Sequence, residues 1–165
     1  MWDAYNLRMK KTICILLVAI LGISAGFAQK SYSINDGYKG NVEVGVMHSF
    51  RQGEGFSALT THGFQINPHV FVGGGIGINF LGGDNLSVPL FADFKYYLLD
   101  GKVSPFVNLR LGYAFGDDDY DLEGFYLTPA LGCRVALSKN IGLNMSLGCV
   151  AKEHGGVYVN FGFDF

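Results

Sequence analysis

The most acidic stretch of the chain, Gly-Asp-Asp-Asp-Tyr-Asp-Leu-Glu at 116–123, has the residue types to bind a cation. Every second residue of 117–121 is aspartate, which is the spacing with which an EF-hand calcium loop begins. That loop also needs glycine at its sixth position and glutamate at its twelfth, where this chain has Leu122 and Thr128. The stretch is therefore not an EF-hand. We expect a solvated loop, and a weak surface site for a cation is the alternative.

A serine, a histidine and a carboxylate could also form a nucleophilic catalytic group. Ser57 and His62 are predicted to lie on one strand, with Glu54 in the loop before it. Nucleophilic catalysis needs the hydroxyl, the imidazole and the carboxylate in mutual contact. The spacing does not fix such contact, and no sequence signature of an enzyme accompanies these residues. We therefore expect no catalytic site, with an enzymatic role for this trio as the alternative.

Two further motifs have simpler explanations than a binding site. Gly-Gly-Gly-Ile-Gly at 73–77 resembles a phosphate-binding loop, but the period-two pattern continues to Phe80 without the helix that such a loop requires. Cys133 and Cys149 are predicted on one face of neighbouring strands, nearly opposite each other. We expect two free thiols, and a cross-strand disulfide is the alternative. No cysteine or histidine spacing predicts a metal site or a cofactor.

The elements that position these residues are predicted to be β-strands. Glycine accounts for 24 of 165 residues, roughly twice its average usage, and helices tolerate glycine poorly. Large apolar residues alternate with polar residues or glycine in period two, which is the pattern of a strand with two unlike faces. The alternation recurs about eight times, at 41–47, 60–66, 70–80, 88–98, 107–115, 125–137, 143–149 and 157–165.

The residue types on the two faces of these strands indicate whether the fold lies in a membrane or in water. One face is apolar with aromatic residues near its ends, as at Phe80, Tyr96 and Tyr113, and the other face is glycine, small polar residues and a few charges. Asp100-Gly101 has the sequence of a tight hairpin turn, whereas stretches such as 51–57 are predicted to be longer loops. This combination is typical of membrane barrels. We predict an all-β fold, an eight-stranded antiparallel up-and-down transmembrane β-barrel, with a soluble barrel or sandwich as the alternative.

The N-terminal region is predicted to direct export. Lys10 and Lys11 precede an apolar run at 13–23, and small residues follow it, which is the pattern of a cleaved signal peptide. We divide the chain into an upstream extension plus signal peptide at 1–28, a short segment at 29–37 and a barrel domain at 38–165. Removing 1–28 leaves 9 basic and 13 acidic residues, a formal charge of −4 that argues against nucleic-acid binding.

The strand pattern and the final residue resemble a known class of proteins. The signal peptide, eight amphipathic strands and terminal Phe165 are similar to small outer-membrane β-barrels of the OmpA/OmpX type. Residues 61–80 resemble the porin-like outer-membrane β-barrel domain of Bacteroidetes-type bacteria. The resemblance implies a Gram-negative outer-membrane location with both termini in the periplasm. It also implies that the barrel-assembly machinery reads the last strand, so that Phe161, Phe163 and Phe165 form an assembly signal.

The charges on the polar face should meet inside the barrel. An eight-stranded barrel is narrow enough for side chains to fill it, and buried charges need partners. A two-residue turn at Asp100-Gly101 would place Asp93 opposite Asn108, with Arg110 as its diagonal neighbour. Asp164 also faces inward. The predicted polar network comprises Glu43, Asp93, Lys95, Asn108, Arg110 and Arg134, with Asn144 and Asn160 as further hydrogen-bond partners. Its role is a structural plug, or alternatively a path for protons or ions.

These observations predict a non-enzymatic integral outer-membrane protein with a structural or envelope role and no wide pore. Its expected partners are outer-membrane lipids, lipopolysaccharide and the barrel-assembly machinery, and we expect a monomer. A surface-binding or small-solute passage barrel is one alternative. A lipid-modifying outer-membrane enzyme is the other.

Overall fold

The computed structural model describes residues 37–165 apart from 52, 83–84, 117–122, 139 and 152–154. The predicted export segment at 1–28 and the segment at 29–36 lie outside the described residues, as do the aspartates at 117–121. Expectations for these parts of the chain therefore stay predictions. Among the described residues, no helical segment has the length and apolar character needed to cross a lipid bilayer.

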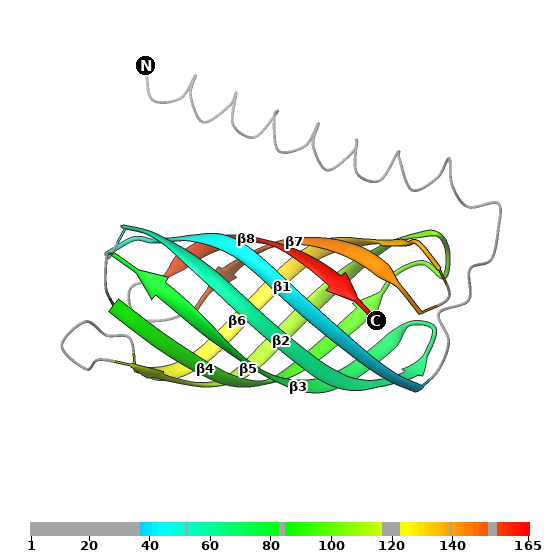
Figure 1. Ribbon diagram of the computed structural model, residues 1–165, viewed down its shortest axis with the longest axis horizontal. Coiled ribbons are helices and arrows are strands. Elements are labelled where there is room, and N and C mark those ends of the chain that lie inside the picture. Colours follow the sequence, from blue (N-terminus) through cyan, green and yellow to red (C-terminus); the bar gives the residue numbers. More distant parts are fainter. Residues whose placement is uncertain (1–36, 52, 83–84, 117–122, 139, 152–154) are drawn as a thin grey trace, which may run out of the picture.

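The described chain forms a closed barrel of eight antiparallel strands, each hydrogen-bonded to its neighbours in sequence (Figure 1). This confirms the predicted up-and-down architecture. The last strand pairs with the first, and Val42 lies opposite Phe163, so the sheet has no free edge. The strands are β1 Gly37–Ser49, β2 Gly53–Asn67, β3 Val70–Leu81, β4 Asn85–Tyr97, β5 Val103–Gly116, β6 Gly124–Ala136, β7 Gly142–Val150 and β8 Gly156–Asp164.

Most connections at both ends of the barrel are short. We call the end that holds Gly37 and Phe165 the terminal end, and the opposite end the far end (Figure 1). The connections at the terminal end are 68–69, 98–102 and 137–141, and those at the far end are 50–52, 82–84, 117–123 and 151–155. The predicted contrast between tight turns at one end and longer loops at the other was therefore wrong, because only 117–123 is distinctly long.

The strand β2 shows why the longer loops were wrongly predicted. The stretch 51–57 was predicted to be a loop because it is rich in glycine and polar residues, but β2 begins at Gly53. Gly55 and Ser57 are buried on the inner face, and Phe56 between them is exposed on the outer face. The stretch is therefore a strand whose inner positions are small, since the barrel interior leaves little room there.

The connection between β4 and β5 also differs from prediction. A type I′ turn requires positive φ at both central residues, and Gly101 lacks it. Instead the backbone N–H of Leu98 donates to the carbonyl oxygen of Pro105 at 2.8 Å, which closes a wider connection. Asp93 consequently lies directly opposite Arg110 rather than Asn108. The register moves by two residues, so every side chain keeps its predicted face.

Small residues on the inner face make room for large rings. Gly63 and Gly73 lie opposite each other on β2 and β3. A Cβ atom added to either would come within 2.9 Å of the Phe71 ring. A Cβ atom on Gly75 would likewise lie 2.6 Å from the Phe91 ring. Such distances are too short for carbon atoms, so the glycines define the space that the aromatic side chains fill.

Candidate functional site

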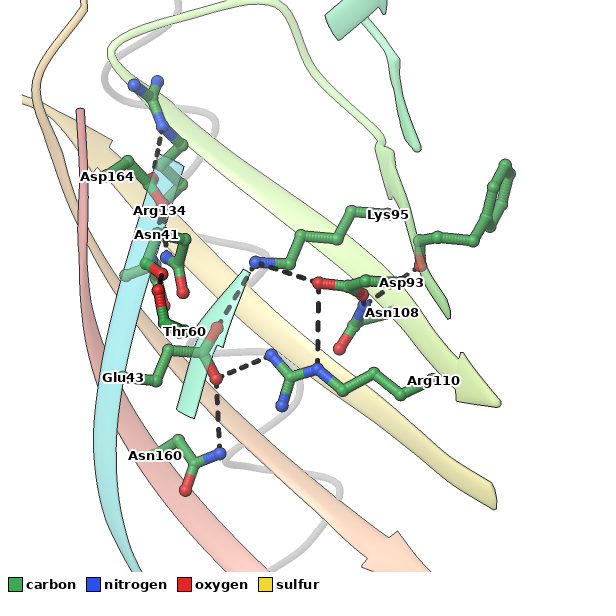
Figure 2. Close-up of polar contacts among 12 residues, drawn as sticks. Asn41, Glu43, Thr60, Asp93, Lys95, Asn108, Arg110, Arg134, Asn160 and Asp164 are labelled. Carbon is green, nitrogen blue, oxygen red and sulfur yellow. Dashed lines mark hydrogen bonds and ion pairs between the residues drawn. The ribbon is translucent and has the colours of Figure 1, made fainter. Parts of the chain in front are cut away.

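The barrel interior, or lumen, brings four charged side chains together near its middle. Glu43 from β1, Asp93 and Lys95 from β4, and Arg110 from β5 all point inward because they occupy alternate positions of their strands. We call these four residues the central cluster (Figure 2). Each is at most 2% exposed, and the two positive charges balance the two negative charges.

Glu43 is the acceptor that joins three strands. Its carboxylate lies 2.6 Å from Nη2 of Arg110 and 3.3 Å from Nζ of Lys95. Nδ2 of Asn160, from β8, donates to the same carboxylate at 3.3 Å. Figure 2 shows these groups converging on the carboxylate from three sides. The contacts link β1 with its neighbour β8 and, across the lumen, with β4 and β5, so Glu43 joins the closing strand pair to the opposite wall.

Asp93 is the second carboxylate of the central cluster. Nδ2 of Asn108 donates a hydrogen bond to it. Nζ of Lys95 lies 3.8 Å away and Nε of Arg110 lies 3.7 Å away. Asn108 bonds to Asp93 although the two residues are diagonal neighbours rather than opposite each other. Asp93 and Asn108 are therefore in contact as predicted, but the strand register between them differs from the prediction.

Aromatic rings surround the two cations of the central cluster. Nζ of Lys95 lies 5.8 Å from the Phe71 ring centre and 5.7 Å from that of Phe106. The guanidinium of Arg110 lies 5.4 Å from the centre of the Phe91 ring. Cation–π attraction of this kind adds about 0.5–2 kcal/mol when the site is shielded from water. The rings and ion pairs together fill the middle of the lumen.

Arg134, the sixth residue of the predicted network, lies in a separate group. Its Nε donates to Oδ2 of Asp164 at 2.8 Å. Asn41 and Asn144 donate to Oδ1 of Asp164 at 2.5 and 2.8 Å. With Lys39, these four residues line the terminal end of the lumen, and we call the five the terminal cluster. The single network of the sequence-based prediction is thus two groups.

Sequence reasoning missed three members of the terminal cluster, Lys39, Asn41 and Asp164. Asp164 was recognised as inward-facing but was not assigned to Arg134, because the pairing of β8 with its neighbours was not worked out residue by residue. Lys39 was missed because the first strand was predicted to begin at Asn41, whereas β1 begins at Gly37. The alternation of Lys39, Asn41 and Glu43 was the signal that could have extended the strand.

The catalytic alternative is not supported by the arrangement of β2. Ser57 faces the lumen, where its hydroxyl donates to Oδ1 of Asn160 at 3.0 Å. His62 faces outward, and its ring nitrogens lie 2.6 Å from the Tyr38 hydroxyl and 3.1 Å from that of Thr60. Because Ser57 and His62 lie on opposite faces of the wall, they cannot meet. Glu54 is in the strand itself and not in a loop.

Cys133 and Cys149 are free thiols, as expected. The prediction that they lie nearly opposite each other was wrong, because Cys133 on β6 pairs with Met145 on β7 and Cys149 lies further along β7. Among the described residues, no group of three or more histidine, cysteine, aspartate or glutamate side chains could hold a metal ion. The segment Gly73 to Gly77 lies inside β3, so packing explains its glycines.

The three phenylalanines of the predicted assembly signal lie on the outer face at the end of the chain. Phe161, Phe163 and Phe165 are all exposed. Phe165 continues the β1–β8 pairing beyond β8, since its N–H and carbonyl exchange hydrogen bonds with Gly40 at 2.9 and 2.8 Å. The Phe165 ring covers Gly40, where any Cβ atom would collide with it.

No family model matches the chain, and no curated protein matches its sequence. Solved structures match its fold. Neisserial surface protein A aligns with TM-score 0.57 and 17% identity over 78% of this chain and 95% of that one. The N-terminal β-barrel domain of Pseudomonas aeruginosa OprF aligns with TM-score 0.52 and 15% identity over 79% and 100%, respectively. A de novo designed transmembrane β-barrel aligns with TM-score 0.50 and 14% identity over 77% and 95%. The chain has the fold of the small outer-membrane β-barrels, as predicted, whereas a Bacteroidetes-type origin stays a prediction.

Proposed function

We propose that the protein is an integral outer-membrane β-barrel with a structural role in the cell envelope and a plugged lumen. One observation carries this proposal: the wall is inverted relative to a soluble barrel. Large apolar side chains such as Val44, Leu90 and Leu131 are more than half exposed on the outer face, while charged side chains fill the interior. Exposure of this large apolar surface to water would be unfavourable, whereas lipid chains would cover it.

The distribution of aromatic residues supports a membrane-spanning position. Tyr38 and Tyr96 are exposed on the outer face near the terminal end, and Tyr113 and Phe115 are exposed near the far end. Such rings favour the boundary between lipid chains and headgroups. Outer-membrane lipids and lipopolysaccharide are thus the partners of the outer face, and the closed sheet offers no edge for a further strand, which favours a monomer.

A structural role is favoured over transport because the middle of the lumen is filled. The central cluster pairs each charge with an opposite one and places its two cations beside aromatic rings, which favours a stable plug. A wide path for solutes would need an open channel at this level. The separation of Ser57 from His62 supports the absence of enzymatic activity.

Envelope fractionation and gel electrophoresis test the proposal. A barrel in the outer membrane should sediment with that membrane and should migrate differently before and after boiling. Recovery of the chain as a soluble periplasmic protein would refute the location. In planar bilayers the purified protein should give no steady conductance. A reproducible current would overturn the plugged lumen and favour the passage function.

The last strand is proposed to guide insertion from the periplasm, where both termini would lie. Phe165→Ala should lower the amount of heat-modifiable barrel in the envelope several-fold, because the assembly machinery loses the terminal aromatic side chain. Phe115→Ala is the matched control, since Phe115 is also an exposed outer-face ring but lies at the far end.

The stability of the barrels that do assemble separates recognition from packing. Urea unfolding midpoints of the two alanine variants, measured on folded protein, should be similar. If Phe165→Ala reduces the midpoint in proportion to its lower yield, the residue acts through packing on Gly40 and the assembly role is wrong.

A further inference from the structure

The terminal end of the lumen contains a small polar cavity that the structural role does not use. Its lining residues come from six of the eight described strands and include Lys39, Asn41, Gln65, Lys95, Arg134 and Asp164. The cavity measures about 10 Å³, which is near the lower limit for one water molecule, so a larger monatomic ion requires a flexible lining side chain to move. The cavity therefore selects for a monatomic or similarly small guest.

The charges around this cavity do not balance. Lys95 belongs to the neutral central cluster, where Glu43 and Asp93 compensate it. The terminal cluster has two cations, Lys39 and Arg134, against the single carboxylate of Asp164. Lys39 is 8% exposed and Arg134 is 3% exposed, so neither is simply solvated. Burial of an uncompensated cation is unfavourable, and a bound anion of unit charge would make this end of the lumen neutral.

Arg134 also has a donor that no protein group uses. Its Nε is bound to Asp164, whereas Nη2 is buried without a hydrogen-bond partner. Figure 2 shows the two terminal nitrogens pointing away from Asp164 and from the other side chains drawn. Among the described residues, no carboxylate lies within 4 Å of the Lys39 ammonium. Lys39 and Arg134 both line the cavity, so a guest inside it would lie beside both residues.

The carboxylate of Asp164 does not compete for these donors. Asn41 and Asn144 donate to its Oδ1, and Arg134 Nε donates to its Oδ2. The side-chain oxygens of Asn41 and Asn144 are themselves buried without a donor, which would suit a water molecule. A neutral water would leave the excess positive charge in place, so the charge distinguishes the two guests.

We propose that this cavity binds one small inorganic anion, with chloride as the prototype, between the ammonium of Lys39 and the guanidinium of Arg134. The flexible stem of Lys39 adjusts to the radius of the ion, while Arg134 is held by Asp164. The ion would neutralise the terminal end of the lumen and stabilise the folded barrel. The inference depends on the folded barrel alone and not on its place in the envelope, so the two proposals can fail separately.

Thermal unfolding in detergent micelles tests the site, with chloride replaced by gluconate at constant ionic strength. Gluconate is too large for the cavity. The unfolding midpoint of the full chain should rise with the logarithm of chloride concentration above the dissociation constant. Lys39→Met should abolish this dependence, and Lys39→Arg should retain it. Lys102→Met is the matched control, because Lys102 is exposed at the same end; it should behave as the wild type.

Crystals soaked in bromide give a second measurement that needs no variant. An anomalous peak should appear between Arg134 and Lys39. Equal midpoints in chloride and gluconate, with no bromide peak at this position, would show that the cavity holds water only and would overturn the proposal. Chloride dependence that survives Lys39→Met would also overturn it, since the ion would then bind elsewhere. If Lys39→Met does not fold, the bromide peak decides.

Discussion

The inner and outer faces of the barrel wall have opposite chemistry although they alternate along the same strands. Leu109 and Arg110 are consecutive residues near the middle of β5. Leu109 is 44% exposed on the outer face, and Arg110 is 1% exposed inside the lumen. One peptide bond therefore separates a side chain that needs an apolar surrounding from one that needs ionic partners.

The two faces are therefore stabilised in different ways. Outer residues depend mainly on what surrounds the barrel. Inner residues depend on one another, because Glu43, Asp93, Lys95 and Arg110 share partners. A substitution inside should therefore disturb several contacts at once. The effect of a substitution outside should depend mainly on whether lipid or water surrounds the barrel.

The largest expected effect is on the inner face. Arg110→Leu removes one of the two cations that contact both carboxylates of the central cluster, leaving Lys95 as the only cation of the cluster against Glu43 and Asp93. Removal of one partner from a buried ion pair costs about 3–5 kcal/mol because the remaining charge stays buried. Urea unfolding of the purified barrel in detergent or lipid vesicles should show this loss, with the folded variant still found in the envelope.

Lys102→Leu is the control for this change, because Lys102 is an exposed cation in the β4–β5 connection. It should alter the free energy of unfolding by less than about 0.5 kcal/mol. An Arg110→Leu barrel with wild-type stability would mean that the central cluster does not hold the wall together.

The second effect concerns the outer face at the same depth. Leu109→Arg should reduce the free energy of unfolding in lipid vesicles by about 2–4 kcal/mol, because a cation near the middle of the bilayer loses its hydration. Leu137→Arg is the matched comparison, since Leu137 is an exposed outer residue just past the end of β6. There the cost should be about 0–1 kcal/mol.

A dependence on depth would distinguish a membrane barrel from a soluble one. In a soluble barrel both arginines would reach water, and neither would be costly. Equal and small effects of Leu109→Arg and Leu137→Arg would therefore contradict the inverted wall, whatever the result at Arg110.

The sequence predicted the faces of the wall correctly because successive side chains of a strand point to opposite faces. Only the parity of a residue, that is, whether it is at an odd or an even position of its strand, decides its face. Arg110, Asp93 and Glu43 were expected inside, and the phenylalanines of β8 outside, from period-two alternation alone. The predicted barrel also requires the last strand to pair with the first, and β8 does lie beside Val42 to Val46. Parity survives small errors in where a strand begins, which is why the interior was right although the bounds of β2 were wrong.

Contacts across strands were harder to predict because they depend on register. The turn at Asp100-Gly101 has a hairpin sequence, but the chain closes it through Leu98 and Pro105 instead, and Asp93 gains Arg110 as its direct partner. Arg134 and Asp164 lie on β6 and β8 with β7 between them. Their contact requires two registers to be known together, and no local signal in the sequence specifies both.

The smallest expected effect compares two adjacent glycines on β3. Gly75 faces the lumen, where a Cβ atom would lie 2.6 Å from both the Phe91 ring and the carbonyl oxygen of Thr60. Gly74 faces outward, where the nearest atom to an added Cβ is 3.6 Å away. Gly75→Ala should cost about 1–3 kcal/mol through overpacking, whereas Gly74→Ala should add up to about 1 kcal/mol by restricting the unfolded chain. Urea unfolding of both variants measures the difference. Equal effects would mean that Phe91 can move aside, and the tight filling of the lumen would then not be what requires glycine at this level of the wall.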